Sequence, residues 1–238
     1  MRTGVRKTDS AAPSVPRCLH CASRPLCVVG RLSPPERERL GPFILERAFR
    51  KGDVLQEQQR MSEQLRIVKI GTMLLMRRGI SGQRSVIAVS GRGQTLGVLA
   101  LLGECEILDC HSASAGRMCE IGLEAVRRQG LADSRFLLAL ASLEVASLAR
   151  MADWAQLVHL RSMHARLLVA LRLLAAEQGS SCVRIPSRSV LAELLGTTRE
   201  TVTRSLGTLV QMRDLVRRDR WHYELRVDER PDGAQRTG

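Results

Sequence analysis

The stretch Leu191-Ala-Glu-Leu-Leu-Gly-Thr-Thr-Arg-Glu-Thr-Val-Thr-Arg204 decides the fold of the last third of this 238-residue chain. Apolar residues at helical spacing flank Gly196-Thr-Thr198, and a glycine in so short a turn is typical of two helices that meet at an angle. Thr198 can act as the N-cap of the second helix. We expect helices over 187–195 and 199–212, then a β-hairpin over 215–218 and 222–227. This order predicts a winged helix-turn-helix.

The second helix of this unit carries side chains that can read DNA bases. Glu200, Thr203 and Arg204 stand at i, i+3 and i+4, so they project from one face near the N-terminal end. Arginine can donate twice to guanine, glutamate can accept from cytosine, and threonine can offer a methyl group to thymine. Arg199 and Thr201 are better placed for phosphate contacts. The alternative is an ordinary surface helix with an ion pair between Glu200 and Arg204.

The middle of the chain has the pattern of a compact antiparallel β-structure. Short apolar stretches alternate with glycine-containing turns, which favours a roll or barrel and indicates strands at 54–55, 65–70, 72–76, 85–89, 95–102 and 116–121. The segment around Cys105 and Cys110 has a loop-like sequence. A helical pattern follows Gly122 for about 35 residues.

This helical segment carries a seam at alternating steps of four and three, which is typical of a coiled coil. Its members are Leu137, Ala141, Glu144, Leu148, Met151, Ala155 and Val158. The seam predicts a homodimer, in which Glu144 would weaken pairing because like charges would face each other in a partly dry interface. The alternative is a core helix of a monomer, with Glu144 reaching water.

Three closely spaced cysteines mark the N-terminal segment Cys18-Leu-His-Cys21-Ala-Ser-Arg-Pro-Leu-Cys27. Thiolates at this spacing can converge on one soft metal centre, but a zinc site or an iron-sulfur cluster needs a fourth ligand. The candidates for that ligand are His20, Cys105, Cys110, Cys119 and Cys182. Residues 1–17 have the composition of a disordered arm, and we expect the cysteine segment to be loose as well.

The composition narrows the class of protein. The formal net charge is +13, which favours nucleic acid as a partner. No apolar run is long enough for a membrane span and no secretion signal precedes Cys18, so we expect a cytoplasmic protein without a membrane partner. No nucleophile-base pair, phosphate loop or paired carboxylates can be recognised, and we therefore do not expect an enzyme.

These features together resemble one bacterial family. Leu191–Gly196 and Arg199–Arg204 are similar to the recognition element of the cyclic AMP receptor protein and fumarate-nitrate reduction regulator (CRP/FNR) superfamily. The resemblance covers nearly the whole chain and implies an α+β fold: a cyclic-nucleotide-binding-like antiparallel β-roll, a long dimerisation helix and a winged helix-turn-helix. It implies domains at 1–30 (cysteine-bearing arm), 31–125 (roll), 126–160 (dimerisation helix) and 161–230 (DNA-binding domain), with a tail at 231–238.

Within the superfamily the cysteine spacing resembles the FNR branch. That resemblance implies that Cys18, Cys21, Cys27 and Cys119 hold an oxygen-labile 4Fe-4S cluster, and that the loaded dimer binds a two-fold symmetric site on double-stranded DNA and activates or represses transcription with RNA polymerase. Zinc or a thiol switch is the alternative. The branch reads DNA with Glu-x-x-Ser-Arg, where this chain has Glu200, Thr203 and Arg204. The stretch from Gly97 to Ser114 has no arginine for a cyclic phosphate, so no cyclic nucleotide is expected.

Overall fold

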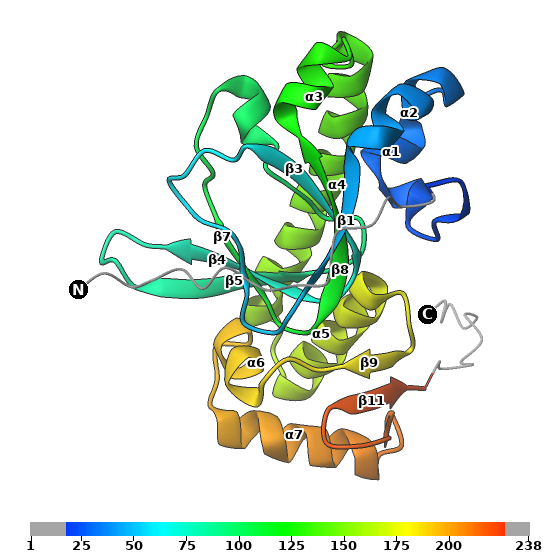
Figure 1. Ribbon diagram of the computed structural model, residues 1–238. Helices are drawn as coiled ribbons and strands as arrows, with labels where there is room; N and C mark the ends of the chain where they lie inside the picture. The colour runs from blue at the N-terminus through cyan, green and yellow to red at the C-terminus, as the bar shows by residue number, and fades with distance from the viewer. Residues whose placement is uncertain (1–17, 227–238) are drawn as a thin grey trace, which may run out of the picture.

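The computed structural model describes residues 18–226 as a β-roll, a long helix and a C-terminal helical unit with a small sheet (Figure 1). The arm expected over 1–17 and the tail expected over 231–238 lie outside the described residues. Sheets and helices occupy separate parts of the chain, so the architecture is α+β and confirms the predicted fold class.

Two four-stranded antiparallel sheets form the roll, in the orders β1-β8-β3-β6 and β2-β7-β4-β5. The strands are β1 (Ile44–Phe49), β2 (Val54–Gln56), β3 (Gln64–Ile70), β4 (Met73–Arg78), β5 (Arg84–Ser90), β6 (Thr95–Leu96), β7 (Asp109–Ser112) and β8 (Gly116–Gly122). Gly71 turns the chain from β3 to β4 with φ +121°, and a Cβ there would lie 2.7 Å from the Phe49 ring. Only glycine fits that turn.

Two strand predictions in the roll need correction. The strand expected over 95–102 ends at Leu96 because Gly97 has φ +83°, and a 3-10 helix, η4 (Leu99–Leu102), follows. The segment around Cys110, expected as a loop, contains β7, in which Cys110 is completely buried. The polar sequence Asp109-Cys-His-Ser112 thus forms a strand, in which the Asp109 and Ser112 side chains make hydrogen bonds inside the protein.

The helical segment after the roll is interrupted. Instead of one helix over 126–160, the chain forms α3 (Leu123–Arg128), α4 (Ser134–Gln156) and η5 (Leu157–His159). Gly130 takes φ +63° between α3 and α4, and the Asp133 side chain accepts a 2.8 Å hydrogen bond from the Phe136 amide. A left-handed glycine followed by an N-cap ends one helix and starts the next.

The cysteine segment is folded rather than loose. It forms η1 (Cys18–His20), η2 (Arg24–Leu26) and α1 (Val28–Arg31), followed by α2 (Pro34–Leu40) and η3 (Gly41–Phe43). Val28 and Val29 are almost fully buried, and the Ser23 hydroxyl donates to the Lys69 carbonyl at 3.0 Å. These contacts fix residues 18–31 against the roll, which no local pattern in the segment predicts.

The C-terminal unit is the expected winged helix-turn-helix with one extra strand. It contains α5 (Met163–Gln178), β9 (Cys182–Arg184), α6 (Arg188–Leu194), α7 (Arg199–Gln211), β10 (Leu215–Arg217) and β11 (His222–Leu225). The wing strands β10 and β11 pair as predicted, and β9 adds to β11 in the order β10-β11-β9.

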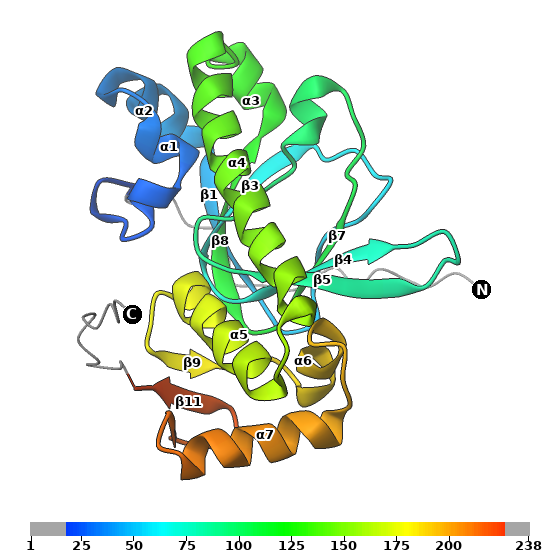
Figure 2. The same ribbon diagram turned by 180° about the vertical axis from the view of Figure 1, so that it is seen from behind.

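Two hydrophobic cores connect these parts. One joins the arm, β1, β3, β8, α3 and the start of α4, where Phe136 and Leu140 are buried. The other joins β4, β5 and β7 to Trp154 near the end of α4 and to the helices of the C-terminal unit. Figure 2 shows α4 running across the roll from one region to the other. Between residues 18 and 226, no helix is long and apolar enough to cross a membrane.

Candidate functional site

The helix α7 exposes the side chains that the sequence assigned to base reading. Glu200, Thr203 and Arg204 are exposed, while Val202 and Leu206 on the opposite face are buried. The amphipathic sequence thus fixes which side of α7 faces out. Figure 1 shows α7 along the outer edge of the C-terminal unit, away from the roll. The three side chains are therefore open to a groove of DNA.

Local hydrogen bonds support this arrangement. The Thr198 hydroxyl accepts from the Thr201 amide at 3.2 Å, which confirms Thr198 as the N-cap. The Thr203 hydroxyl donates to the Arg199 carbonyl at 2.9 Å, so this hydroxyl is engaged within the helix. In the described part of the chain Glu200 and Arg204 form no ion pair, which leaves both free for a partner.

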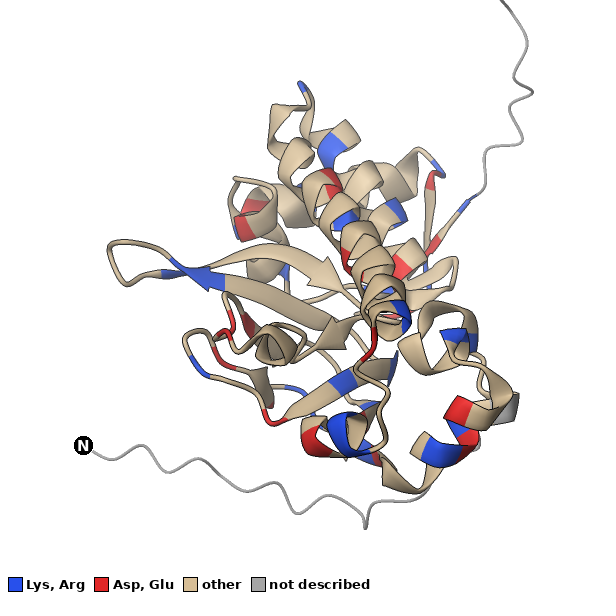
Figure 3. Cartoon of the chain, turned by 90° about the horizontal axis from the view of Figure 1, so that it is seen from above, with Lys and Arg blue, Asp and Glu red and all other residues tan. Residues whose placement is uncertain are grey.

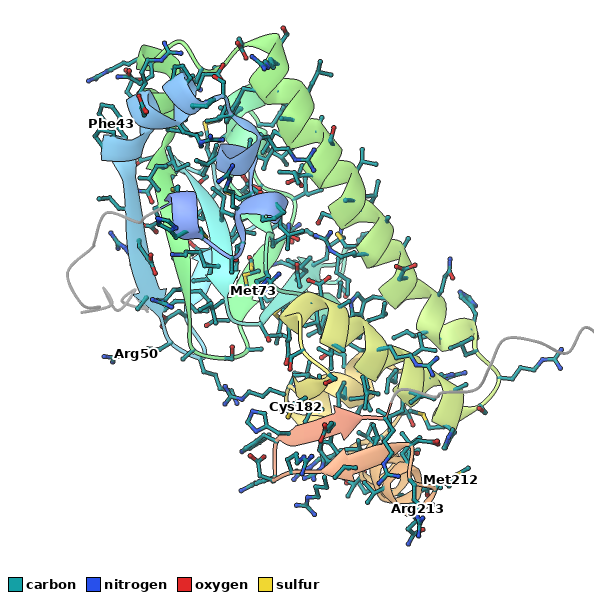
Figure 4. The ribbon with its side chains drawn as sticks, turned by 90° about the vertical axis from the view of Figure 1, so that its right-hand side faces the viewer. Phe43, Arg50, Met73, Cys182, Met212 and Arg213 are labelled. Atoms are coloured by element: carbon teal, nitrogen blue, oxygen red, sulfur yellow. The ribbon has the colours of Figure 1, made fainter. Side chains whose placement is uncertain are left out.

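The wing adds positive charge beside α7. Asp219 closes its turn by accepting from the Trp221 and His222 amides at 2.6 and 2.8 Å, and these hydrogen bonds with the His222 side chain lower the pKa of Asp219 to about 2. The Arg220 guanidinium lies 5.0 Å from the Trp221 ring centroid. Figure 4 places Arg213 at the end of α7, at the lower edge of the same unit. The wing is thus a rigid, basic turn suited to phosphate contact.

The second candidate site is a small cavity lined by all four predicted cysteine ligands. Cys18, Cys21 and Cys27 of the arm and Cys119 of β8 line it together. Cys119 stands in the centre of its sheet, opposite Glu46 of β1 and Ile67 of β3. The family resemblance implied a ligand set of three cysteines from the arm and one from the roll. The structure brings these four side chains to one cavity.

Burial and mutual proximity both act on these thiols. Burial raises the pKa of Cys27 to about 11 and that of Cys119 to about 12, and it raises the pKa of Cys18 as well. The neighbouring cysteines contribute to each of these pKa increases, so the four groups lie within electrostatic reach of one another. Holding them as thiolates requires a positive centre.

Cationic side chains surround the cavity. Lys69, Arg24 and Arg37 contribute to its lining, and Lys69 lowers the pKa of Cys18 and Cys119 against the larger effect of burial. Sequence reasoning missed all three residues. Lys69 carried a signal, since it follows Leu65 and Ile67 at the inward positions of β3 and is a charge on a buried face.

The other candidates for a fourth ligand lie elsewhere. Cys105 and Cys182 are exposed, and Cys110 is buried in β7 with its sulfur 3.6 Å from that of Met73. His20 is exposed and does not line the cavity. This placement argues against a zinc site of three cysteines and His20, and against a thiol pair between the exposed Cys105 and the buried Cys110.

The cavity has a volume of only about 20 Å³, so its walls would have to move apart to admit a cluster, but the set of donor atoms suits a cluster better than a single ion. Among residues 18–226, no three His, Cys, Asp or Glu side chains converge as ligands of one metal ion. Zinc-sulfur bonds of about 2.3 Å would draw the sulfurs to roughly 4 Å from one another. A 4Fe-4S cluster takes one thiolate at each of four irons and so accepts wider spacing. Four thiols around one cavity, with cations nearby to balance an anionic cluster, match that donor set.

The exposed apolar surface of α4 differs from the predicted seam. Leu137, Ala141, Leu148, Ala155 and Val158 are exposed as a dimer interface requires. Glu144 and Met151 are half-buried against their own chain instead. The exposed apolar stripe is therefore rotated around the helix axis relative to the predicted seam. It consists of Leu138, Ala141, Val145, Leu148, Ala152 and Ala155.

Glu144 is half-buried against its own chain, near Arg150 and Glu106. Burial raises its pKa to about 7, Arg150 opposes this change, and Glu106 adds to it. Glu106 is itself buried, and one of its carboxylate oxygens has no hydrogen-bond partner among residues 18–226. The seam itself stays a prediction, with five of its seven members exposed and Glu144 and Met151 half-buried.

Two family models match separate parts of the chain. Residues 46–131 match the family described as Cyclic nucleotide-binding domain, and residues 165–229 match the family described as Crp-like helix-turn-helix domain. No curated protein matches the sequence. Figure 3 shows basic residues on the roll, the long helix and the C-terminal unit alike, so charge alone would not have located the DNA-binding part.

Solved structures share this fold at low sequence identity. FixK2 from Bradyrhizobium japonicum is 19% identical with a TM-score of 0.65, over 77% of this chain and 93% of that one. The c-di-GMP responsive global regulator CLP from Xanthomonas campestris is 18% identical with a TM-score of 0.61, over 82% and 100%. A CRP/FNR family transcriptional regulator from Thermus thermophilus is 20% identical with a TM-score of 0.57, over 76% and 93%.

Proposed function

Because this chain belongs to the CRP/FNR family of transcriptional regulators, we propose that its four clustered cysteines hold a 4Fe-4S cluster that makes dimerisation and DNA binding respond to oxygen. The family regulates transcription and does not catalyse a reaction, and DNA is bound through the helix-turn-helix. The observation that carries the proposal is the convergence of Cys18, Cys21, Cys27 and Cys119 on one cavity. When bound, the cluster would supply an oxygen-reactive inorganic centre.

The residues around the cavity suggest how the signal would reach the rest of the molecule. Cys18, Cys27 and Cys119 pack into the same hydrophobic core as Phe136 and Leu140 of α4. Helix α1, which follows Cys27 directly, contacts α4. Ligation would tie the arm to β8 and so fix α1 against the start of the long helix. Loss of ligation would release that constraint at the element expected to form the dimer.

The free energy available is sufficient for such a switch. Moving a population from mostly monomer to mostly dimer requires a bias of about 5.5 kcal/mol. Metal-thiolate binding in small sites is worth about 10 kcal/mol or more. Only part of the ligation energy therefore needs to favour the dimer.

The decisive experiment isolates the chain without air and assays iron and acid-labile sulfide. We expect a brown protein that contains both, that is dimeric, and that binds DNA sequences selected from a random pool. After exposure to air it should lose the colour, become monomeric and release the DNA. A colourless protein that contains stoichiometric zinc would contradict the proposal and favour a zinc staple.

Two cysteine variants make the test specific. Cys119→Ser removes a ligand at the cavity, and Cys182→Ser changes an exposed cysteine outside it. Iron content, dimer formation and selective DNA binding should fall together in the first variant and stay unchanged in the second. The proposal fails if Cys119→Ser keeps its iron and binds DNA as the parent chain does.

A further inference from the structure

A cleft lies beside the contact between the roll with its arm and the C-terminal unit. Its volume is about 710 Å³, within the range of small-molecule sites. The arm contributes His20 and Cys21, the roll contributes Lys69 and Arg92, and the C-terminal unit contributes Arg184 and neighbouring residues. In Figure 4 the arm lies above α5 and β9 on one side of the roll, and these are the parts that border the cleft. A ligand bound there would touch all three.

The lining of this cleft has an excess of positive charge. Four cationic side chains face it, from Lys69, Arg92, Arg117 and Arg184, against the single carboxylate of Glu177. The Glu177 carboxylate already forms an ion pair with Arg150, whose Nε atom lies 2.9 Å from Glu177 Oε1. Arg150 itself does not line the cleft. The cleft is thus electrostatically suited to an anion.

Among these cations, Arg92 gives the strongest indication of an anion site. Its Nε atom is buried and has no hydrogen-bond partner within the described residues, which is costly for a charged group. The guanidinium lies against Gly179 at the end of α5, where a Cβ would come within 3.0 Å of Arg92 Nη1. The C-terminal dipole of α5 stabilises the charge there but does not satisfy the buried donor.

The other three cationic side chains of the cleft are partly or wholly available to bind a ligand. Lys69 and Arg117 share Glu46, at 2.5 and 3.2 Å. Arg184 pairs with no carboxylate in residues 18–226, and its backbone is held by Gln178 through hydrogen bonds of 2.7 and 2.8 Å. Arg92 belongs to the roll and Arg184 to the C-terminal unit, and two arginine side chains at one cleft can donate to different oxygens of one phosphate group.

We propose that this cleft binds a small phosphate-bearing anion, and that the bound anion holds the C-terminal unit against the roll through Arg92 and Arg184. The site is separate from the cysteine cavity and goes beyond oxygen sensing. Cys21, Ser23 and Lys69 line both cavities, however, so an occupant of the cleft also contacts residues that shape the cysteine site. The cleft would thereby give the regulator a second, metabolite-type input.

The test titrates the full chain with inorganic phosphate, pyrophosphate and ATP at low salt, by isothermal calorimetry. Phosphate and pyrophosphate probe the anion site itself, and ATP shows whether the occupant is a nucleotide. The double variant Arg92→Gln with Arg184→Gln should weaken binding of the preferred anion by at least tenfold. Arg172→Gln, at an exposed position of α5 outside the cleft, is the matched control and should bind as the parent chain does.

The results separate this inference from the proposed function. Binding should persist in Cys119→Ser, whether or not that variant contains iron, because none of the four cations is changed. The inference is overturned if none of the three anions binds at millimolar concentration, or if the double variant binds them as well as the Arg172→Gln control. It is also overturned if the double variant loses only affinity for DNA, since the cations would then serve the nucleic acid backbone.

Discussion

At the scale of single residues, Arg204 tests the assignment of α7 to base reading. Its side chain is exposed near the N-terminal end of the helix and is not neutralised by Glu200 in the described chain. We expect Arg204→Ala to weaken binding to a selected sequence by about 1–3 kcal/mol, which is roughly five- to 150-fold. Competition binding against random DNA measures this loss. Arg213→Ala should instead weaken all sequences alike and reduce the salt dependence, because phosphate contacts carry no sequence information.

Glu144 provides a test of pH dependence at the same scale. Its folded pKa of about 7 lies above the ordinary value of 4.5 because burial disfavours the charged form. Its contribution to stability is therefore complete below pH 4.5 and is lost as the pH rises through 7. We expect Glu144→Gln to raise the melting temperature by a few degrees at pH 8 and by less at pH 5. Glu38→Gln, an exposed carboxyl on α2, should leave both values unchanged.

These residues also show what sequence reasoning can reach. The reading face of α7 was predictable because Thr198, Val202 and Leu206 fix its start and its buried side locally. The environment of Glu144 was not, since its neighbour Glu106 lies in the loop after η4 and is brought near only by the fold. The position of Lys69 beside the cysteines is likewise set by the fold and not by local sequence. Local spacing predicts the face of an element but not what packs against it.

At the scale of elements, the exposed stripe of α4 is the surface expected to form the dimer. Ala141 lies in this stripe, whereas Ala146 is equally exposed but outside it. We expect Ala141→Glu to convert the dimer to monomer, because an unpaired charge would be buried in the interface. Ala146→Glu should leave the dimer intact. Sedimentation of the anaerobic protein distinguishes the two, and equal behaviour of both variants would contradict this location of the interface.

Element boundaries show where sequence patterns lose their power. Helices α6 and α7 and the wing were located nearly to the residue because a turn glycine and caps mark their ends. The break between α3 and α4 was missed, although Gly130 and Asp133 are a stop signal and a start signal. The apolar periodicity continued across the break and masked it. The arm was missed for another reason, since Val28 and Val29 are buried by tertiary contacts with α4 and the roll.

At the scale of the whole molecule, the position of the C-terminal unit depends on close packing between the roll and α5. The Arg92 amide donates to the Glu177 carbonyl at 3.1 Å, and the Val86 amide of β5 donates to Glu193 of α6 at 2.7 Å. Gly91 lies at this contact, where a Cβ would come within 2.3 Å of the Glu177 carbonyl oxygen. Because the contacting atom belongs to the backbone, it cannot move aside as a flexible side chain can. Any larger residue at position 91 must therefore push the roll and the C-terminal unit apart.

Gly91→Ala therefore tests whether the two parts behave as one cooperative unit. Overpacking of this kind costs about 1–3 kcal/mol, and the same core spans β5, α5 and α6 in the parent chain. We expect the parent to unfold in one calorimetric transition, and we expect the variant to show two transitions at lower temperature. Gly79→Ala, in the exposed β4–β5 hairpin with only Gln83 O at 3.9 Å, should keep one transition at the parent temperature. One unshifted transition in Gly91→Ala would mean that the contact yields without cost, and the anion cleft would then lack a rigid far wall.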